Sequence, residues 1–186
     1  DAASLSKSVS TFGRQREDAE IDRALEQVCA SGSGSTIVIE GDPGMGKSMV
    51  LASAIERAKA LGVRVLIGAA SDIERSTPYF VFRRVFAELC GVGSVATTSP
   101  PGSSPDQPTN PSAKERLEEL LRPFPDLWEL APLVGPVLGL SFAETALTKS
   151  FEGEVRADNT RKVLIALLRE AATRCRLLII IEDAQW

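Results

Sequence analysis

The chain has 186 residues, of which 44% are hydrophobic and 25% are charged, and its formal net charge at pH 7 is -4. These values are typical of one soluble globular domain or most of one. They exclude a protein that is drawn to nucleic acid or to an anionic membrane surface by bulk electrostatic attraction.

The rest of the composition excludes further classes. No apolar run approaches the roughly 20 residues that a membrane-spanning helix needs, and the N-terminus lacks the pattern of a secretory signal. Three cysteines lie far apart without CxxC spacing, which favours free thiols in a reducing compartment. There is no histidine, the commonest general base and metal ligand. We therefore expect a cytoplasmic protein.

The first half of the chain predicts a strand, a loop, a helix and a second strand. Apolar residues recur at helical spacing in 16–29, which predicts an amphipathic helix before this unit. TIVIE at 36–40 is short and β-branched and predicts a buried strand. Residues 47–61 predict a helix that ends at Gly62, and 63–70 predict the second strand. Because a helix between two strands usually joins parallel neighbours, we expect a parallel sheet.

The second half predicts helices around a flexible insertion. Helical spacing in 78–89 and in 113–122 predicts two amphipathic helices. Between them, 92–112 is rich in Pro, Ser, Gly and Thr, which is typical of a flexible surface insertion. The apolar segment 123–140 is interrupted by prolines and predicts short helical turns, whereas 160–175 predicts a long amphipathic helix.

The stretch GDPGMGKS at 41–48 fits the phosphate-loop pattern G-x-x-x-x-G-K-[ST], with a predicted strand before it and a predicted helix after it. Glycines let backbone N–H groups turn toward an anion, and the start of the helix adds free N–H groups and a favourable dipole. Lys47 is expected to reach the β- and γ-phosphates, and the Ser48 hydroxyl is expected to bind Mg²⁺. The alternative is a glycine-rich strand–helix turn that binds nothing. The predicted nucleotide-binding residues of this stretch are Gly41, Asp42, Pro43, Gly44, Met45, Gly46, Lys47, Ser48 and Met49.

A second motif follows far downstream, where the apolar run LLIII at 177–181 predicts a strand that ends in Glu182 and Asp183. A nucleoside triphosphatase needs one carboxylate near the Mg²⁺ shell and one near the attacking water. By position, we assign the metal role to Glu182, together with Ser48, and the catalytic role to Asp183, together with Lys47. Two acids that only face solvent are the alternative, which the phosphate loop makes the weaker interpretation.

A family resemblance rests on four segments in a fixed order. These are Phe12-Gly13-Arg14, GDPGMGKS, STPYFVFRRVF at 76–86 and IIIEDAQW at 179–186. In this order they resemble the AAA-like, STAND-type signalling ATPases, which include the ATPase region of LuxR-type transcriptional regulators. The resemblance is nearest to the ATPase modules of soluble-type class III adenylyl cyclases, and LWELAPLVGPVLGL at 127–140 adds to it. It covers about residues 10–186 apart from the insertion.

The resemblance implies a three-layer α/β P-loop fold with a five-stranded parallel sheet. It implies that 12–186 is the N-terminal part of this domain after a tail at 1–11, and that the C-terminal strands and lid lie outside the given sequence. We therefore expect a fragment that folds poorly by itself. It also implies ATP and Mg²⁺ as ligands, and it places Phe12, Gly13 and Arg14 near the adenine. Many relatives have Asp where this chain has Glu182, which puts hydrolysis in doubt and leaves binding intact.

These observations predict an ATP-binding and ATP-hydrolysing regulatory module of a larger signalling protein. Its expected partners are the nucleotide and other domains of the same chain, without direct contact to nucleic acid or membrane. Two alternatives stay open: a nucleotide-binding switch or scaffold without turnover, and a P-loop kinase of small molecules. The oligomeric state stays open as well.

Several further residues have weaker functional interpretations. Arg83 and Arg84 are predicted to lie on a solvated helix face, with contact to a phosphate or a neighbouring subunit as the alternative. Arg156 and Arg161 flank the last helix and are predicted to lie on the surface, with a charge-sensing role as the alternative. Trp128 is predicted to lie in the core and not in a ligand site.

Overall fold

The computed structural model describes residues 14–70, 78–91 and 111–184. The chain divides into two compact units, of which the first comprises Asp1–Val65 with Arg176–Leu178 and the second Leu66–Cys175 with Ile179–Trp186. The division runs through both strands, β1 (Arg64–Ala69) and β2 (Leu177–Glu182). The N-terminal tail, Phe12, Gly13 and 92–110 of the predicted insertion lie outside the described residues.

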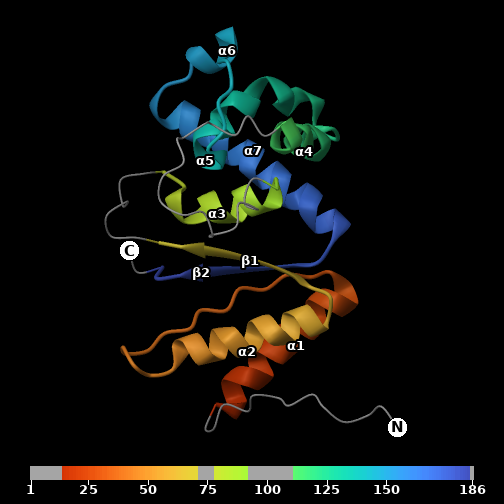
Figure 1. Ribbon diagram of the computed structural model, residues 1–186, viewed down its shortest axis with the longest axis vertical. Helices are drawn as coiled ribbons and strands as arrows, with labels where there is room; N and C mark the ends of the chain where they lie inside the picture. The colour runs from red at the N-terminus through yellow and green to blue at the C-terminus, as the bar shows by residue number, and fades with distance from the viewer. Residues whose placement is uncertain (1–13, 71–77, 92–110, 185–186) are drawn as a thin grey trace, which may run out of the picture. The chain divides into compact units, whose positions relative to one another are not determined.

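The first unit contains two helices that lie side by side, α1 (Gln15–Ser31) and α2 (Lys47–Ala60) (Figure 1). Both confirm helices that the hydrophobic periodicity predicts, and the chain turns away from α2 at Gly62, whose φ of 71° suits glycine. The apolar faces of the two helices meet, because each helix alone would leave its stripe in water. The buried core of this unit consists of Ile21, Leu25, Val50, Ala54, Ala58 and Val63.

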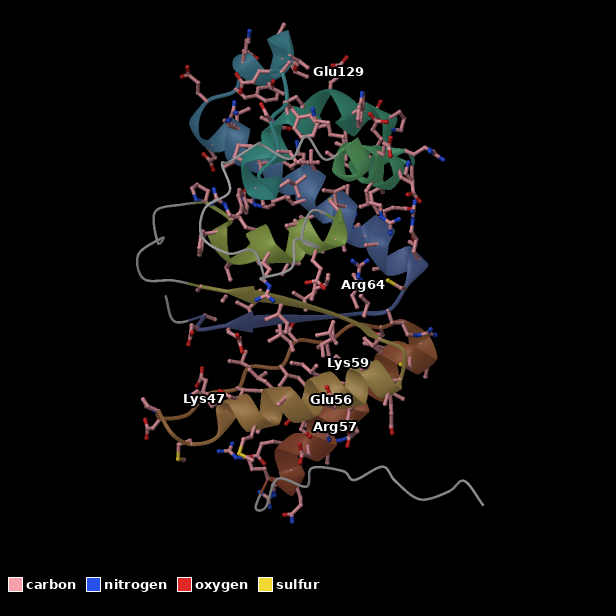
Figure 2. All side chains as sticks on the ribbon, viewed as in Figure 1. Lys47, Glu56, Arg57, Lys59, Arg64 and Glu129 are labelled. Carbon is pink, nitrogen blue, oxygen red and sulfur yellow. The ribbon has the colours of Figure 1, made fainter. Side chains whose placement is uncertain are left out.

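An ion-pair cluster supports the same helix pair. Arg57 of α2 donates to the Asp18 carboxylate at 2.7 Å, and its second terminal nitrogen lies 2.9 Å from Asp22. Figure 2 shows Arg57 on the side of α2 next to α1. Asp18 also lies in the first turn of α1, where a negative charge complements the helix dipole.

The two strands form a parallel pair. The Arg64 N–H donates to the Arg176 carbonyl at 2.9 Å, and the Ala70 N–H donates to the Glu182 carbonyl at 3.0 Å. Moving six residues along one strand therefore moves the same distance, in the same direction, along the other. The sheet of the described residues has this one pair, β1 with β2. A parallel sheet is therefore confirmed at the level of two strands, but the partner of β1 is LLIIIE and not TIVIE, with which the sequence predicts it to share a strand–helix–strand unit.

The predicted strand TIVIE at 36–40 is wrong, because the structure assigns no strand to this segment. Strand structure requires a ladder of hydrogen bonds to a neighbour, and this segment has no ladder partner among the described residues. The Val38 side chain is 73% exposed and Ile37 is 38% exposed, so the segment is also not buried. Ile39 alone packs against the core of the first unit.

The second unit is helical apart from its strand residues. The predicted helices at 78–89 and 113–122 are confirmed, and the proline-interrupted segment forms short helical turns as predicted. The last helix starts at Gly153, before the predicted 160. The prediction missed its first turns because they are largely polar and have no hydrophobic periodicity. The helices are α3 (Phe80–Leu89), α4 (Pro111–Leu121), η1 (Pro125–Val134), α5 (Gly135–Leu138), α6 (Ala146–Lys149) and α7 (Gly153–Arg174).

Helix α7 is the centre of the second unit, where it packs against η1 and α4 (Figure 1). Its residues Val163 and Leu167 are fully buried. Arg174 at its end pairs with Glu119 of α4 and with Glu170. None of the helices that the structure describes is long and apolar enough to cross a membrane.

Helix α3 lies directly against β1 at Gly68. A Cβ atom at this position would lie 2.2 Å from the Val81 carbonyl oxygen, a distance that real side chains do not adopt. Gly68 therefore allows the first turn of α3 to touch the strand, which is the usual reason for a glycine inside a strand.

Candidate functional site

The stretch 41–48 forms a loop that leads into α2. Gly44 has φ 83° and Gly46 has φ 78°, which are left-handed conformations that favour glycine. Gly46 is the residue before the first turn of α2, so the loop ends where the free N–H groups of the helix begin. Gly44 and Gly46 therefore lie where the backbone of the loop needs glycine.

Several backbone N–H groups of the loop have no acceptor in the described part of the chain. The Met45 N–H donates to the Asp42 carbonyl at 3.2 Å, which closes the turn. The N–H groups of Gly44, Gly46, Lys47 and Ser48 have no acceptor within the described part of the chain. Unpaired N–H groups next to a helix N-terminus form an anion site, because each can donate to an oxygen and the helix dipole favours negative charge.

The Lys47 side chain folds back over the loop. Its Nζ atom donates to the Gly41 carbonyl at 2.7 Å and to the Asp42 carbonyl at 3.0 Å. Figure 2 shows Lys47 at the loop end of α2. An ammonium group has three N–H donors, so one remains for an anion at the loop.

The remaining residues of the predicted set lie in the same loop. Asp42 and Pro43 form its exposed tip, and Ser48 is exposed in the first turn of α2. Met45 and Met49 are each 56% exposed, which is unusual for large apolar side chains.

Arg14 also reaches the loop. It is the residue before α1, and its guanidinium donates to the Met45 carbonyl oxygen. The same side chain lies 3.7 Å from the Glu17 carboxylate, and one of its nitrogens is 3.9 Å from the Cβ position of Gly46. Its contact to the loop backbone has no signal in the sequence. The predicted location of Phe12, Gly13 and Arg14 near an adenine stays a prediction.

The acidic pair ends β2 as predicted. Glu182 is the last residue of the strand and Asp183 follows it, and both are exposed. Asp183 has φ 54°, a left-handed conformation that few side chains adopt and that Asp tolerates better than most. Residues in such conformations gather at functional sites. The pair belongs to the second unit, whereas the phosphate loop and Arg14 belong to the first.

Two of the weaker arginine candidates lie on α3. Arg84 is exposed, as predicted for a solvated face. Arg83 is half-buried over the Phe80 ring at 5.7 Å, and its buried Nε atom has no hydrogen-bond partner in the described ranges. The prediction of a solvated face is therefore wrong for Arg83, whose neighbour on the helix is aromatic.

The other two arginines have structural partners. Arg156 donates to the Thr148 carbonyl at 3.1 Å and to the Glu144 carboxylate at 2.8 Å, which fastens α7 to the preceding segment. Arg161 is exposed and lies 3.0 Å from Asp158 on the same helix, as expected for a surface residue.

Trp128 is not in the core, because 43% of it is exposed. It lines an open hollow with Glu118, Leu121, Arg122 and Pro125. A tryptophan in a 3-10 turn presents its ring outward here, which the apolar composition of 123–140 does not reveal.

No group of three or more His, Cys, Asp or Glu side chains in the described ranges has the arrangement of a metal site. The residues at the loop nevertheless fit a nucleotide with its Mg²⁺. Four free N–H groups and an ammonium donor match phosphate oxygens, and the exposed Ser48 hydroxyl is a suitable Mg²⁺ ligand.

The comparison with protein families agrees with this geometry. The family model described as AAA ATPase domain matches residues 10–186. No curated protein and no solved structure matches the chain. Domains of this family are nucleotide-binding ATPase modules with a P-loop α/β fold, and they generally bind ATP with Mg²⁺. The match covers nearly the whole sequence, and the chain therefore belongs to the AAA ATPase domain family.

Proposed function

We propose that the chain binds Mg-ATP at the loop 41–48, hydrolyses it, and serves as a regulatory module of a larger signalling protein. The observation that carries the proposal is the set of four free N–H groups beside the Lys47 ammonium. Phosphate oxygens are the ligands that satisfy such donors together. We propose ATP and not another nucleoside triphosphate, because domains of this family generally bind ATP.

The proposed roles follow from the chemistry of each side chain. Lys47 stabilises negative charge on the β- and γ-phosphates with the N–H that the loop carbonyls leave over. Ser48 and Glu182 are the residues that we assign to Mg²⁺, which would neutralise phosphate charge when bound. Asp183 directly follows the strand, and we assign its carboxylate to accept the proton of the attacking water.

One observation favours a second candidate function, a nucleotide-binding switch without turnover. Many relatives of the family have Asp at the position of Glu182. The glutamate side chain is longer, so its carboxylate lies farther from the strand backbone than an aspartate carboxylate would. The phosphate loop does not depend on this residue, so binding would remain while hydrolysis slows or stops.

The context of the module is proposed from the resemblance of 73–86, 127–140 and 182–186 to ATPase modules of cyclases and transcriptional regulators. The same proposal includes a three-layer P-loop fold with further strands and a cytoplasmic location. It also includes other domains of the same chain as partners. Differential affinity of two domain arrangements for ATP would supply the switch.

The test is a titration of the chain with Mg-ATP, with affinity and phosphate release measured together. The variant is Lys47→Ala, and the matched control is Lys59→Ala, an exposed lysine of the same helix that pairs with Glu56 at 3.1 Å (Figure 2). We expect Lys47→Ala to weaken binding by about 10- to 100-fold, as is usual for a lost charge-assisted contact, and Lys59→Ala to bind normally.

Each outcome decides between the candidates. Binding together with phosphate release supports the ATPase, and Asp183→Asn should then abolish release while binding stays. Binding without release supports the switch, and Glu182→Asp should then be tested for a gain of release. An unmodified chain that is folded and does not bind Mg-ATP contradicts both candidates.

A further inference from the structure

We infer that Arg14 is a positioning residue that fixes the orientation of the Met45–Gly46 peptide, and with it the direction of one phosphate-binding N–H group. The inference rests on the proposed function for its consequence, since the N–H of Gly46 is one of the four free donors of the loop. In this role Arg14 holds the loop backbone in place and does not bind the nucleotide.

The first step is peptide geometry. The carbonyl of Met45 and the N–H of Gly46 belong to one planar trans peptide, so they point in opposite directions. The Arg14 guanidinium donates to this carbonyl oxygen. Holding the oxygen on one side of the loop therefore holds the Gly46 N–H on the other.

The second step is that this peptide has no support from the loop itself. The Gly41 and Asp42 carbonyls accept from Lys47, and the Gly46 carbonyl accepts from the Met49 and Val50 N–H groups. The Met45 carbonyl has Arg14 as its donor within the described residues. Because glycine adopts many φ and ψ values, Gly46 does not hold the peptide by its own sterics.

The third step is that Arg14 has a fixed starting point. It precedes α1, and its guanidinium lies 3.7 Å from Glu17 in the first turn. Helix α1 packs on α2 through Ile21 and Leu25. Since α2 begins at the loop, the packed helix pair sets the reach from Arg14 to Met45.

The fourth step is the comparison with two other roles. Arg14 as a direct phosphate ligand would act through its charge, and Arg14 as a surface ion pair with Glu17 would act on neither loop nor nucleotide. Arg14→Gln keeps an N–H donor for the carbonyl and removes the charge, whereas Arg14→Met removes both. Arg16→Met is the matched control, since Arg16 is exposed on the first turn of the same helix.

The experiment has two readouts on the full 186-residue chain. The first is the amide ¹H–¹⁵N signal of Gly46 without nucleotide, which we expect to move in Arg14→Met and to stay in place in Arg14→Gln and Arg16→Met. The second is the dissociation constant of Mg-ATP, which we expect to rise about tenfold in Arg14→Met, the effect of one lost hydrogen bond to a charged group. Arg14→Gln should restore most of the affinity, and Arg16→Met should bind like the unmodified chain.

A Gly46 signal that stays in place in a folded Arg14→Met overturns the inference, whatever the nucleotide does. Equal loss of affinity in Arg14→Gln and Arg14→Met, with the signal unchanged in Arg14→Gln, also overturns it, because the charge would then act on the phosphate. An unmodified chain that does not bind Mg-ATP, with a signal that moves in Arg14→Met, contradicts the proposed function and supports the positioning contact. Should Arg14→Met not fold, Arg14→Leu replaces it, because leucine also removes the donor, and an unmoved Gly46 signal in this variant overturns the inference.

Discussion

TIVIE at 36–40 and LLIIIE at 177–182 are two apolar runs of nearly the same length and chemistry, yet only the second is a strand. β2 has β1 as its neighbour, and its Ile180 is 6% exposed. TIVIE has no ladder partner among the described residues, and its Val38 is 73% exposed. The difference shows that β-branched composition prepares a segment for a sheet, while hydrogen-bonded neighbours decide whether it becomes a strand.

The segments that precede the two runs also differ in how firmly they are held. β2 follows α7 directly, and Arg176 before the strand donates to the Cys29 carbonyl at 2.7 Å at the end of α1. TIVIE follows the glycine- and serine-rich segment 31–35, a composition that leaves the chain free to move. Side-chain contacts thus hold the start of one run, and no comparable contact from the described residues holds the start of the other.

The largest expected effect comes from placing a charge in each run. Ile180→Asp should lower the free energy of unfolding by about 4 kcal/mol, because a carboxylate at a buried site loses its hydration. Val38→Asp should change it by less than about 0.5 kcal/mol, since this side chain is largely in water. Urea unfolding of both variants measures the contrast. A loss at Val38 as large as the loss at Ile180 would show that 36–40 is buried in solution.

A smaller effect is expected at Asp183, the point where the paired run ends with φ 54°. Asp183→Gly should have a free energy of unfolding about 1 kcal/mol higher than that of Asp183→Ala, because both variants lack the carboxylate and glycine alone adopts this conformation without a steric penalty. The same variant should lose phosphate release if Asp183 serves the attacking water. Thermal unfolding and a phosphate-release assay test the two halves separately, and Asp183→Asn is the control that keeps the shape. An Asp183→Gly variant that is less stable than Asp183→Ala would argue against strain at this position.

The smallest expected effect concerns the pair that fastens the end of α7 shortly before β2. A hydrogen bond from Arg174 lowers the pKa of the Glu119 carboxyl from its ordinary value. A lowered folded-state pKa stabilises the fold above the unfolded value and loses this effect as the pH falls through the folded value. Glu119→Gln should therefore be slightly less stable than the unmodified chain at neutral pH, and the difference should vanish in acid. Because the pair is exposed, added salt should reduce the difference too.

Much of the fold follows from the sequence, because local periodicity determines its helices. The spacing of Ile21 and Leu25 predicts α1, and the glycine at 62 predicts the end of α2. The run 63–70 predicts β1, and LLIII predicts β2. The sequence predicts less where contacts with other segments determine the structure. TIVIE needs a neighbouring strand to become a strand itself. The polar first turns of α7 contain no apolar stripe from which a helix could be predicted. Trp128 looks like a core residue by type, but the 3-10 turn directs it outward.

The candidate site divides in the same way. The phosphate-loop pattern predicts which residues lie at the start of α2, since glycine spacing and backbone geometry are tied together. The contact of Arg14 to the Met45 carbonyl depends on how two helices pack, and the left-handed Asp183 depends on how the chain leaves the strand. Neither has a pattern in the neighbouring residues that periodicity or motif spacing could detect.

The Lys47 ammonium, bonded to the Gly41 and Asp42 carbonyls, has a consequence for the kinetics of binding. These two hydrogen bonds hold the long side chain at the loop, so association of an anion freezes few additional rotamers. A preorganised site of this kind captures its ligand at a rate set by diffusion and access to the loop. Differences in affinity between nucleotides should then appear mainly in how slowly each one leaves.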